Sequence, residues 1–329
     1  MEVIIEELLV EKGILLIAGL DGVGKSLIAN NTALCLATGT DLFQGKGEGL
    51  KVKKKKVLYL QFEVKDKETQ SRLRKQLKAF NLEDADFTMV PRDQLKDEFE
   101  DKWEQLEQTL KDLSFTDGVV VVDNLYTSTD AEVSDNDSLK GMLRTIGRLT
   151  REYDCSFILI GHFTKGAKNS STLDKIDIQG GKKLTDFVDN ILLVGQSIPV
   201  DELRIGKIAK VRSGKSYLQK IPFKLKMDEN LIFYKFGIID NEEAHLKGTI
   251  KSKEIEVLKT MKPIPRVLNT DKEIFTTEQY RQALTKYKGY EQIERTAYNH
   301  IEKLIKYGVV KKIKKNQYEP LWETLEDSL

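Results

Sequence analysis

The 329-residue chain has only two cysteines and no apolar run long enough to cross a bilayer. Cys35 lies in an apolar helical stretch and Cys155 beside a strand-like stretch, without the spacing of a metal or redox site. Both are therefore expected to be buried core residues. The first 11 residues are amphipathic and acidic, unlike a signal peptide. These absences predict a cytoplasmic protein in a reducing compartment, with no membrane partner.

Charge of neither sign dominates overall, because the formal net charge is only +1. The distribution is uneven, however. Residues 248–318 carry 16 Lys/Arg and 8 Asp/Glu, a local charge of +8, whereas 319–329 carry four acids and no base. A basic C-terminal module indicates a polyanionic partner. The run Lys53–Lys56 is interpreted as a solvated loop, because charge runs usually face water.

Short apolar runs alternate with helical patterns through the first two thirds of the chain. Their Val/Ile/Leu character is typical of strands covered on both faces, and the alternation indicates a parallel sheet. The predicted strands are 13–18, 57–62, 87–90, 118–122, 157–160 and 191–194. Between 203 and 236 the strands become shorter and are separated by turns, which predicts an antiparallel extension. The fold class is therefore α/β.

The C-terminal region follows another pattern. Helical periodicity at 252–261, 277–287 and 291–307 is followed by two short strands, 309–313 and 317–320, around a basic turn at 314–316. Three helices and a hairpin form the plan of a winged helix. The predicted organisation is an α/β domain over 1–240, a linker over 241–250, a winged-helix domain over 251–320 and an acidic tail over 321–329.

The most specific motif is a glycine-rich G-x-x-x-x-G-K-S sequence at 19–26, between the predicted strand 13–18 and a helical stretch at 27–37. Strand, glycine turn and helix form a phosphate-binding loop, or P-loop, in which backbone N–H groups and a helix N-terminus surround phosphate oxygens. A chance glycine turn is the alternative, which the flanking elements disfavour. The motif predicts ATP and Mg²⁺ as cofactors, with Gly19, Asp21, Gly22, Val23, Gly24, Lys25, Ser26 and Leu27 as binding residues.

Three further polar residues come at or just after predicted strand ends. Asp123 ends the run VVVVD, and together with Ser26 it is predicted to hold Mg²⁺. Glu63 follows VLYLQF and is the candidate base that activates a water. The alternatives are the nearby Asp66 and Glu68, which lie farther into a predicted helix, or a plain surface acid at Glu63. His162 ends the strand before FTKG and could read the γ-phosphate and relay its presence to the next loop.

Taken in this order, these segments resemble the RecA-type ATPases, and most closely the family that includes the plasmid replicative helicase RepA; DnaB and KaiC are more distant relatives. The resemblance covers about 13–215. It rests on the P-loop, LYLQFE with Glu63, VVVVDNLYT with Asp123 and LIGHFTKG with His162, and also on 134–137, 180–186 and the Lys210-Val211-Arg212 triplet. It implies a RecA-like P-loop core with a mostly parallel sheet.

The resemblance also implies roles. Glu63 would be the catalytic base, Asp123 would hold Mg²⁺ through water, and His162 would sense the γ-phosphate. Lys210 and Arg212 would reach into a neighbour's ATP site in a homo-oligomer, expected to be hexameric. Single-stranded DNA would pass through a central channel beside the loop 164–183, which has no aromatic residue and offers Lys165, Lys168, Lys175, Lys182 and Lys183.

The last predicted helix, 291–307, resembles a recognition helix that leads into a wing. One face carries apolar residues at helical spacing. The other offers Gln292, Arg295 and Asn299, whose side-chain types reach base edges in the major groove. The wing would place Lys311, Lys312, Lys314 and Lys315 near the phosphates of duplex DNA. A winged helix that contacts protein is the alternative, which the local charge disfavours.

The leading hypothesis is an oligomeric ATP-hydrolysing motor on DNA, a RepA-like helicase or translocase that replicates or mobilises a plasmid or phage-like element. A second hypothesis is an ATP-switched DNA-binding regulator or loader that does not unwind DNA. The aromatic-free loop at 164–183 favours this second reading. A small-molecule phosphotransferase fits least, because the sequence has no evident lid for an acceptor and the basic module would be unexplained.

Overall fold

The computed structural model of the chain describes residues 2–44, 49–62, 66–80, 85–91, 102–126, 136–198, 200–212, 216–239, 242–246, 274–288, 294–306 and 310–320. The chain divides into two compact units. The first comprises 1–168, 173–195 and 202–238, and the second comprises 169–172, 196–201 and 239–329. No helix in the described ranges is both long and apolar enough to cross a membrane.

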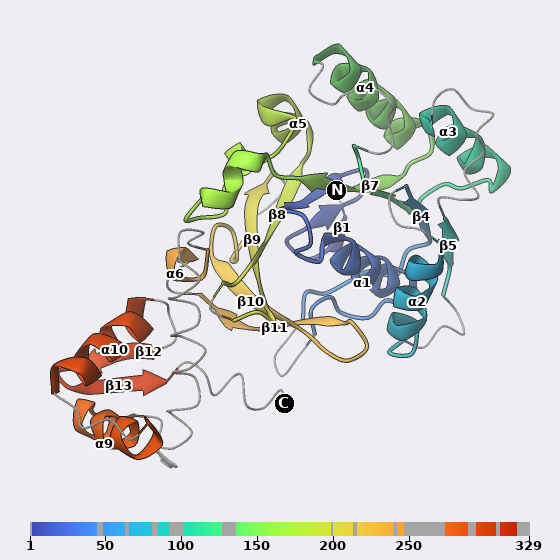
Figure 1. The fold of residues 1–329 in the computed structure, drawn as a ribbon. Helices are drawn as coiled ribbons and strands as arrows, with labels where there is room; N and C mark the ends of the chain where they lie inside the picture. Colours follow the sequence, from blue (N-terminus) through green and yellow to red (C-terminus); the bar gives the residue numbers. More distant parts are fainter. Residues whose placement is uncertain are drawn as a thin grey trace. The chain divides into compact units, whose positions relative to one another are not determined.

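The first unit contains a nine-stranded sheet in the order β11-β10-β9-β8-β3-β7-β6-β4-β5 (Figure 1). Six strands are parallel: β3 (Ile14–Gly19), β4 (Val57–Gln61), β5 (Phe87–Val90), β6 (Val119–Asp123), β7 (Ser156–His162) and β8 (Asn190–Gln196). The antiparallel extension is formed by β9 (Leu203–Val211), β10 (Pro222–Met227) and β11 (Phe233–Ile238). The predicted α/β fold with its antiparallel edge is confirmed.

Helices cover both faces of the parallel part of the sheet (Figure 1). On one face lie α1 (Lys25–Thr38) and α2 (Asp66–Leu77); on the other lie α3 (Lys102–Asp112) and α4 (Asn136–Glu152). The parallel strands β3 and β6 are buried along their whole length. Cover on both faces explains why their sequences read as continuous apolar runs rather than as alternating ones.

Helices α1 and α4 bury different fractions of their surface. Most residues of α1 are buried, because its side chains share one core with Leu15, Ile17 and Tyr59 of the sheet. In contrast, α4 buries only one stripe, formed by Leu139, Met142, Leu143, Ile146 and Leu149 at helical spacing. The P-loop helix is therefore held rigidly within the core.

An N-terminal hairpin was not predicted from the sequence. Strands β1 (Val3–Ile5) and β2 (Leu9–Val10) pair around a tight turn that contains Glu7. The Glu7 carboxylate accepts hydrogen bonds from the backbone N–H groups of Tyr217 and Leu218, at 2.8 and 3.0 Å. A carboxylate that satisfies two backbone donors fixes the segment after β9 to the N-terminus.

Lys55 contradicts the expectation that the run Lys53–Lys56 is a solvated loop. Its side chain is only 7% exposed and its Nζ lies 2.6 Å from Asp117 and 3.4 Å from Glu11. Burial lowers the pKa of Lys55, but these two carboxylates outweigh that effect and the net shift is upward. Lys55 therefore stays charged and links the segment before β4 to the segment before β6.

The second unit contains α6 (Glu242–Leu246), α9 (Thr277–Lys288), α10 (Glu294–Lys306) and the hairpin of β12 (Val310–Lys314) and β13 (Gln317–Pro320). Phe275 exchanges two backbone hydrogen bonds with Tyr318, so it adds a third short pairing to the hairpin. The core includes the buried Phe275, Tyr280, Ala297, Ile301, Leu304 and Tyr318. Ala297, Ile301 and Leu304 thus lie on the inner face of α10, as their spacing predicted.

One detail differs from the predicted C-terminal organisation, and two predicted segments cannot be compared with it. Part of the predicted linker 241–250 forms α6, where the buried His245 contacts the Ser197 hydroxyl through Nδ1 at 2.8 Å. The predicted helix 252–261 and the acidic tail 321–329 lie outside the described residues. The winged-helix assignment and the domain boundaries therefore stay predictions.

The two thiols supply a test of the fold. Burial raises the pKa of Cys35 to about 12 and that of Cys155 to about 11. At pH 8 the thiolate fraction should therefore be about 10²- to 10³-fold lower than for a free cysteine. We expect both thiols of the folded chain to react with Ellman's reagent at least about 100-fold more slowly than after unfolding. Fast modification of Cys35 in the folded protein would contradict this packing.

Candidate nucleotide-binding site

The parallel register brings the predicted site residues to one edge of the sheet. Gly19 at the end of β3 lies opposite His162 at the end of β7, and Gln61 at the end of β4 lies opposite Asp123 at the end of β6. Ligands of open α/β sheets bind at the carboxyl ends of parallel strands. The structure therefore brings together Asp123, His162 and the P-loop, as the sequence predicted.

Two of the P-loop glycines are needed for different reasons. Gly24 has a φ of 95°, in the left-handed region where a side chain is strained. At Gly19, a Cβ atom would lie 2.2 Å from the backbone oxygen of Val194, so only glycine allows β3 to approach β8 this closely. The chain can thus turn sharply from β3 into α1, with the N-terminus of α1 facing the loop.

Lys25 is buried inside the P-loop, with 6% of its surface exposed. Its Nζ donates hydrogen bonds to the backbone oxygens of Gly19 at 3.1 Å and Leu20 at 2.7 Å, and lies 4.0 Å from the carboxylate of Asp21. A buried ammonium next to a helix N-terminus stabilises an anion strongly, because both place positive charge in the same small region. The loop therefore fits a polyphosphate.

Asp123 lies beside Ser26 at the base of the loop. Ser26 Oγ donates to Asp123 Oδ1 at 3.1 Å, while Tyr59 Oη and Gln61 Nε2 donate to Asp123 Oδ2 at 2.8 and 2.9 Å. The fully buried carboxylate is thus held in one orientation, with one oxygen turned to Ser26. Hydroxyl and carboxylate oxygens suit Mg²⁺, which in P-loop sites bridges nucleotide phosphates and neutralises their charge. Ser26 and Asp123 are the residues that would hold it.

His162 contacts a different loop with each ring nitrogen. Nδ1 lies 2.5 Å from Asp21 of the P-loop, and Nε2 lies 2.8 Å from Asn124 Nδ2. Because Asn124 Oδ1 accepts the N–H of Tyr126, the amide nitrogen faces His162 and donates to Nε2. Nδ1 therefore carries the proton and donates a hydrogen bond to Asp21.

His162 is also linked to the segment that follows it. Its backbone oxygen accepts the N–H of Gln179, whose own carbonyl accepts the Tyr126 hydroxyl at 2.6 Å. The rings of Tyr126 and His162 lie 5.4 Å apart. A change at the imidazole can thus reach the 164–183 loop through contacts that are already formed.

Sequence reasoning missed several residues that support this site. Tyr59 and Gln61 orient Asp123, and Arg204 Nε donates to the backbone oxygen of Val23 at 2.9 Å. Gln76 reaches the backbone oxygen of Leu27 in the first turn of α1. Only the position of Tyr59 and Gln61 near the end of an apolar strand could have indicated them.

Glu63, the predicted catalytic base, lies outside the described residues. The residue that precedes the gap is Phe62, whose backbone N–H donates to the Asp123 carbonyl. Phe62, the residue before Glu63, thus lies at the Asp123 edge of the sheet. The catalytic role of Glu63 stays a prediction.

Lys210 and Arg212 lie at the opposite edge of the sheet, where the parallel strands begin. Strand β9 starts with Leu203 next to Arg204, which contacts the P-loop, and Arg212 follows about eight residues later, roughly 25 Å along the strand. The Arg212 guanidinium pairs with Asp189 at 3.0 Å, and Lys210 Nζ donates to the backbone oxygens of Thr185, Asp186 and Val188. Neither residue can act on the P-loop of its own chain.

The 164–183 segment is more regular than the predicted loop. It contains two 3-10 turns, Lys165–Asn169 and Lys175–Asp177, and α5 (Gly181–Phe187) begins before the predicted loop ends. The prediction that Lys182 and Lys183 are loop residues is therefore wrong, because both lie in the first turn of α5. The predicted DNA-contacting lysines of this segment are all exposed: Lys165, Lys168, Lys175, Lys182 and Lys183.

The predicted duplex-binding residues lie in α10 and the hairpin of the second unit. Asn299 is exposed on α10, Arg295 belongs to the same helix, and Gln292 lies outside the described residues. The wing lysines are also exposed: Lys311, Lys312, Lys314 and Lys315. Lys314 is the last residue of β12 rather than part of the turn.

A family model described as an AAA domain matches residues 1–168, about half of the chain. The chain belongs to this AAA-domain family. The matched segment of the AAA-domain protein contains the P-loop, Asp123 and His162, whereas the supporting residues Arg204 and Gln179 lie beyond it. No curated protein matches the chain.

Solved structures resemble the fold of this AAA-domain protein at low sequence identity. A structure described as an ATPase domain is 16% identical with a TM-score of 0.51, covering 69% of this chain and 86% of that domain. A DnaB-like replicative helicase, described with its primase interactions, is 15% identical with a TM-score of 0.49, covering 68% and 59%. The RadB recombinase is 17% identical with a TM-score of 0.46, covering 68% and 90%. The first of these likenesses confirms the predicted RecA-like P-loop fold.

Tyr59 supplies a test of the Asp123 geometry. Tyr59→Phe keeps the buried ring but removes one donor to Asp123 Oδ2, so the carboxylate should lose its fixed orientation. We expect the Mg²⁺ dependence of binding to a fluorescent ATP analogue to weaken about 10- to 100-fold, the usual effect of losing an outer-shell partner. The matched control, Tyr153→Phe, changes a tyrosine just after α4 and should bind like the parent. An unchanged Mg²⁺ titration for Tyr59→Phe would contradict the supporting role of Tyr59.

Proposed function

We propose that this chain is an ATP-hydrolysing motor that acts on DNA as an oligomer, of the RepA-like helicase or translocase kind. The observation that carries the proposal is the meeting of Lys25, Ser26, Asp123 and His162 at one sheet edge. Lys25 and the loop N–H groups would bind the phosphates, and Ser26 and Asp123 the magnesium ion. Glu63, which follows β4, is the proposed base for the attacking water.

His162 is the proposed γ-phosphate sensor. In the structure its Nδ1 donates to Asp21, a carboxylate that also lies 4.0 Å from Lys25. The Asp21 carboxylate thus lies between Lys25 and His162, the two side chains that would face a bound γ-phosphate. A nucleotide would compete with Asp21 for both, and the released imidazole would alter its contacts with Asn124 and the segment that follows.

Arg212 is the proposed residue that acts in a neighbour's site. Its distance from the P-loop of its own chain excludes a role there, whereas a head-to-tail oligomer would bring opposite sheet edges together. Arginine suits such a role because its guanidinium stabilises charge on a transferring phosphoryl group. Lys210 fits less well, since Nζ has three donors and contacts three carbonyls near the end of α5. We assign Lys210 to holding α5 in place.

The ATP site is tested by Lys25→Ala. We expect this variant to lose at least about 100-fold in ATP hydrolysis, because a buried cation that stabilises phosphate charge is removed. The control, Lys140→Ala, removes an exposed lysine paired with Asp137 on α4 and should keep the parental rate. Measured turnover and ATP affinity equal to the parent in Lys25→Ala would refute the proposed function.

The action of Arg212 across subunits is tested by mixing two inactive variants. Arg212→Ala keeps an intact P-loop, and Lys25→Ala keeps an intact Arg212. A mixed oligomer should therefore regain ATP hydrolysis at interfaces where the two intact parts meet. Failure to regain activity, with subunit exchange verified by light scattering on tagged proteins, would reject the trans role and leave the P-loop assignment unaffected.

Duplex DNA is the proposed ligand of the second unit, through Asn299, Arg295 and the exposed wing lysines. We expect replacement of Lys311, Lys312, Lys314 and Lys315 by Gln to lower the slope of log affinity against log salt by about 3 to 4 for a DNA duplex. ATP hydrolysis without DNA should not change. A duplex-binding slope equal to that of the parent would favour a module that contacts protein.

A regulator or loader that does not unwind DNA is the second candidate. The 164–183 segment favours it, because the segment has no aromatic side chain to stack on bases and folds back onto β7 through Phe163 and Ile178. Measuring the unwinding of a forked duplex together with ATP turnover separates the two candidates. DNA-stimulated turnover with strand separation supports the motor, and turnover without separation supports the regulator.

A further inference from the structure

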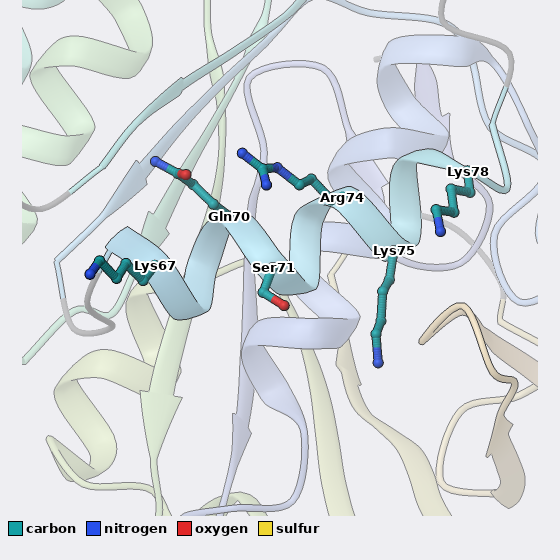
Figure 2. Close-up of a pocket in the computed structure, with 6 residues that line it drawn as sticks. All are labelled: Lys67, Gln70, Ser71, Arg74, Lys75 and Lys78. Carbon is teal, nitrogen blue, oxygen red and sulfur yellow. The ribbon is translucent and has the colours of Figure 1, made fainter.

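Helix α2 carries a groove that the motor site does not use. The groove has a volume of about 440 Å³. Its lining residues come from α2 and the residue after it: Lys67, Gln70, Ser71, Arg74, Lys75 and Lys78. Figure 2 shows these six side chains spread along the length of the helix, from Lys67 at one end to Lys78 at the other. We call them the α2 basic stripe.

The stripe has the spacing of one helical face. Steps of three or four residues place successive side chains above one another. The 11-residue separation of Lys67 and Lys78 corresponds to a length of about 16 Å at 1.5 Å per residue. All six residues are exposed. The stripe therefore presents a continuous row of donors to solvent.

Its charges differ from those of three cations on two other helices. On α4 and α9, Lys140, Arg148 and Arg281 pair with acids three or four residues away. Among the residues whose side chains the structure describes, no carboxylate lies within ion-pair distance of the four stripe cations, and the remaining two members are neutral donors. Four positive charges on three turns attract a polyanion.

Gln76 fixes the direction in which the stripe faces. It is fully buried, and its Nε2 donates to the backbone oxygens of Leu27 in α1 and Leu231 between β10 and β11. A buried amide bonded to two separate segments prevents α2 from rotating about its axis. The stripe is thus a fixed feature of the surface rather than a set of side chains that can turn inward.

We propose that the α2 basic stripe binds the phosphate backbone of a DNA strand, at a site separate from the 164–183 segment and the wing. Phosphate oxygens accept hydrogen bonds from Lys, Arg, Gln and Ser side chains, which are the residue types of the stripe. A protein partner would need an apolar or aromatic centre, and the stripe contains neither. Without aromatic residues the site cannot stack bases, so binding is independent of sequence.

The experiment compares two triple variants of the full chain that lose the same charge. Lys67→Gln/Arg74→Gln/Lys78→Gln alters the stripe, and Lys12→Gln/Lys111→Gln/Lys140→Gln alters lysines that are paired with Asp154, Glu107 and Asp137. Binding of a fluorescein-labelled 30-nucleotide oligo-dT is followed by anisotropy over a salt series. We expect the stripe variant to bind at least about tenfold more weakly at low salt, with a salt slope lower by about 2.

The control variant should match the parent in both affinity and slope. A variant that keeps the charge, Lys67→Arg/Lys75→Arg/Lys78→Arg, should also bind like the parent, because the phosphate contacts are retained. A stripe variant that melts like the parent and binds oligo-dT with the parental affinity and slope would overturn the proposal. The measurement is made without ATP, so it succeeds or fails independently of the Lys25 test.

Discussion

The parallel register of the central strands is the constraint on which this molecule depends. It aligns the ends of β3, β4, β6 and β7, so that Gly19, Gln61, Asp123 and His162 meet at one edge. Close packing of these strands against helices on both faces fixes this register, since a shift by one residue would exchange the side chains of the two faces and spoil their fit. The chemistry of the site is thus specified by the same packing that stabilises the fold.

The charges of the site are satisfied within the protein. Lys25 contacts two carbonyls of its own loop, His162 donates to Asp21, and the Asp123 carboxylate is surrounded by hydroxyl and amide donors. A ligand that brings phosphate and magnesium would replace these contacts rather than enter an empty polar cavity. Differential contact of this kind is what allows a ligand to change the state of a protein.

Outside the nucleotide site, some cations of the first unit stabilise the fold and others are available to bind a partner. Lys210 contacts carbonyls around α5 and Lys55 joins two acids, so these two lysines stabilise the fold. Arg212 pairs with Asp189 in the isolated chain and is the residue proposed to act on a neighbouring subunit. The α2 basic stripe has no such partners among the side chains that the structure describes. The role of a Lys or Arg side chain thus depends on the acids and carbonyls that lie near it in the folded chain. The sequence does not show which groups these are.

The sequence by itself determined the succession of main-sheet strands along the chain, the P-loop and the polar residues that end the strands. Each depends on local properties: apolar runs, glycine turns and residues next to a strand end. Only the tertiary structure decided which residues support the site, because Tyr59 and Gln61 meet Asp123 through strand pairing across more than 60 positions. It also placed Arg212 at the far edge and buried Lys55, since both outcomes depend on partners that are distant in sequence and adjacent only after folding.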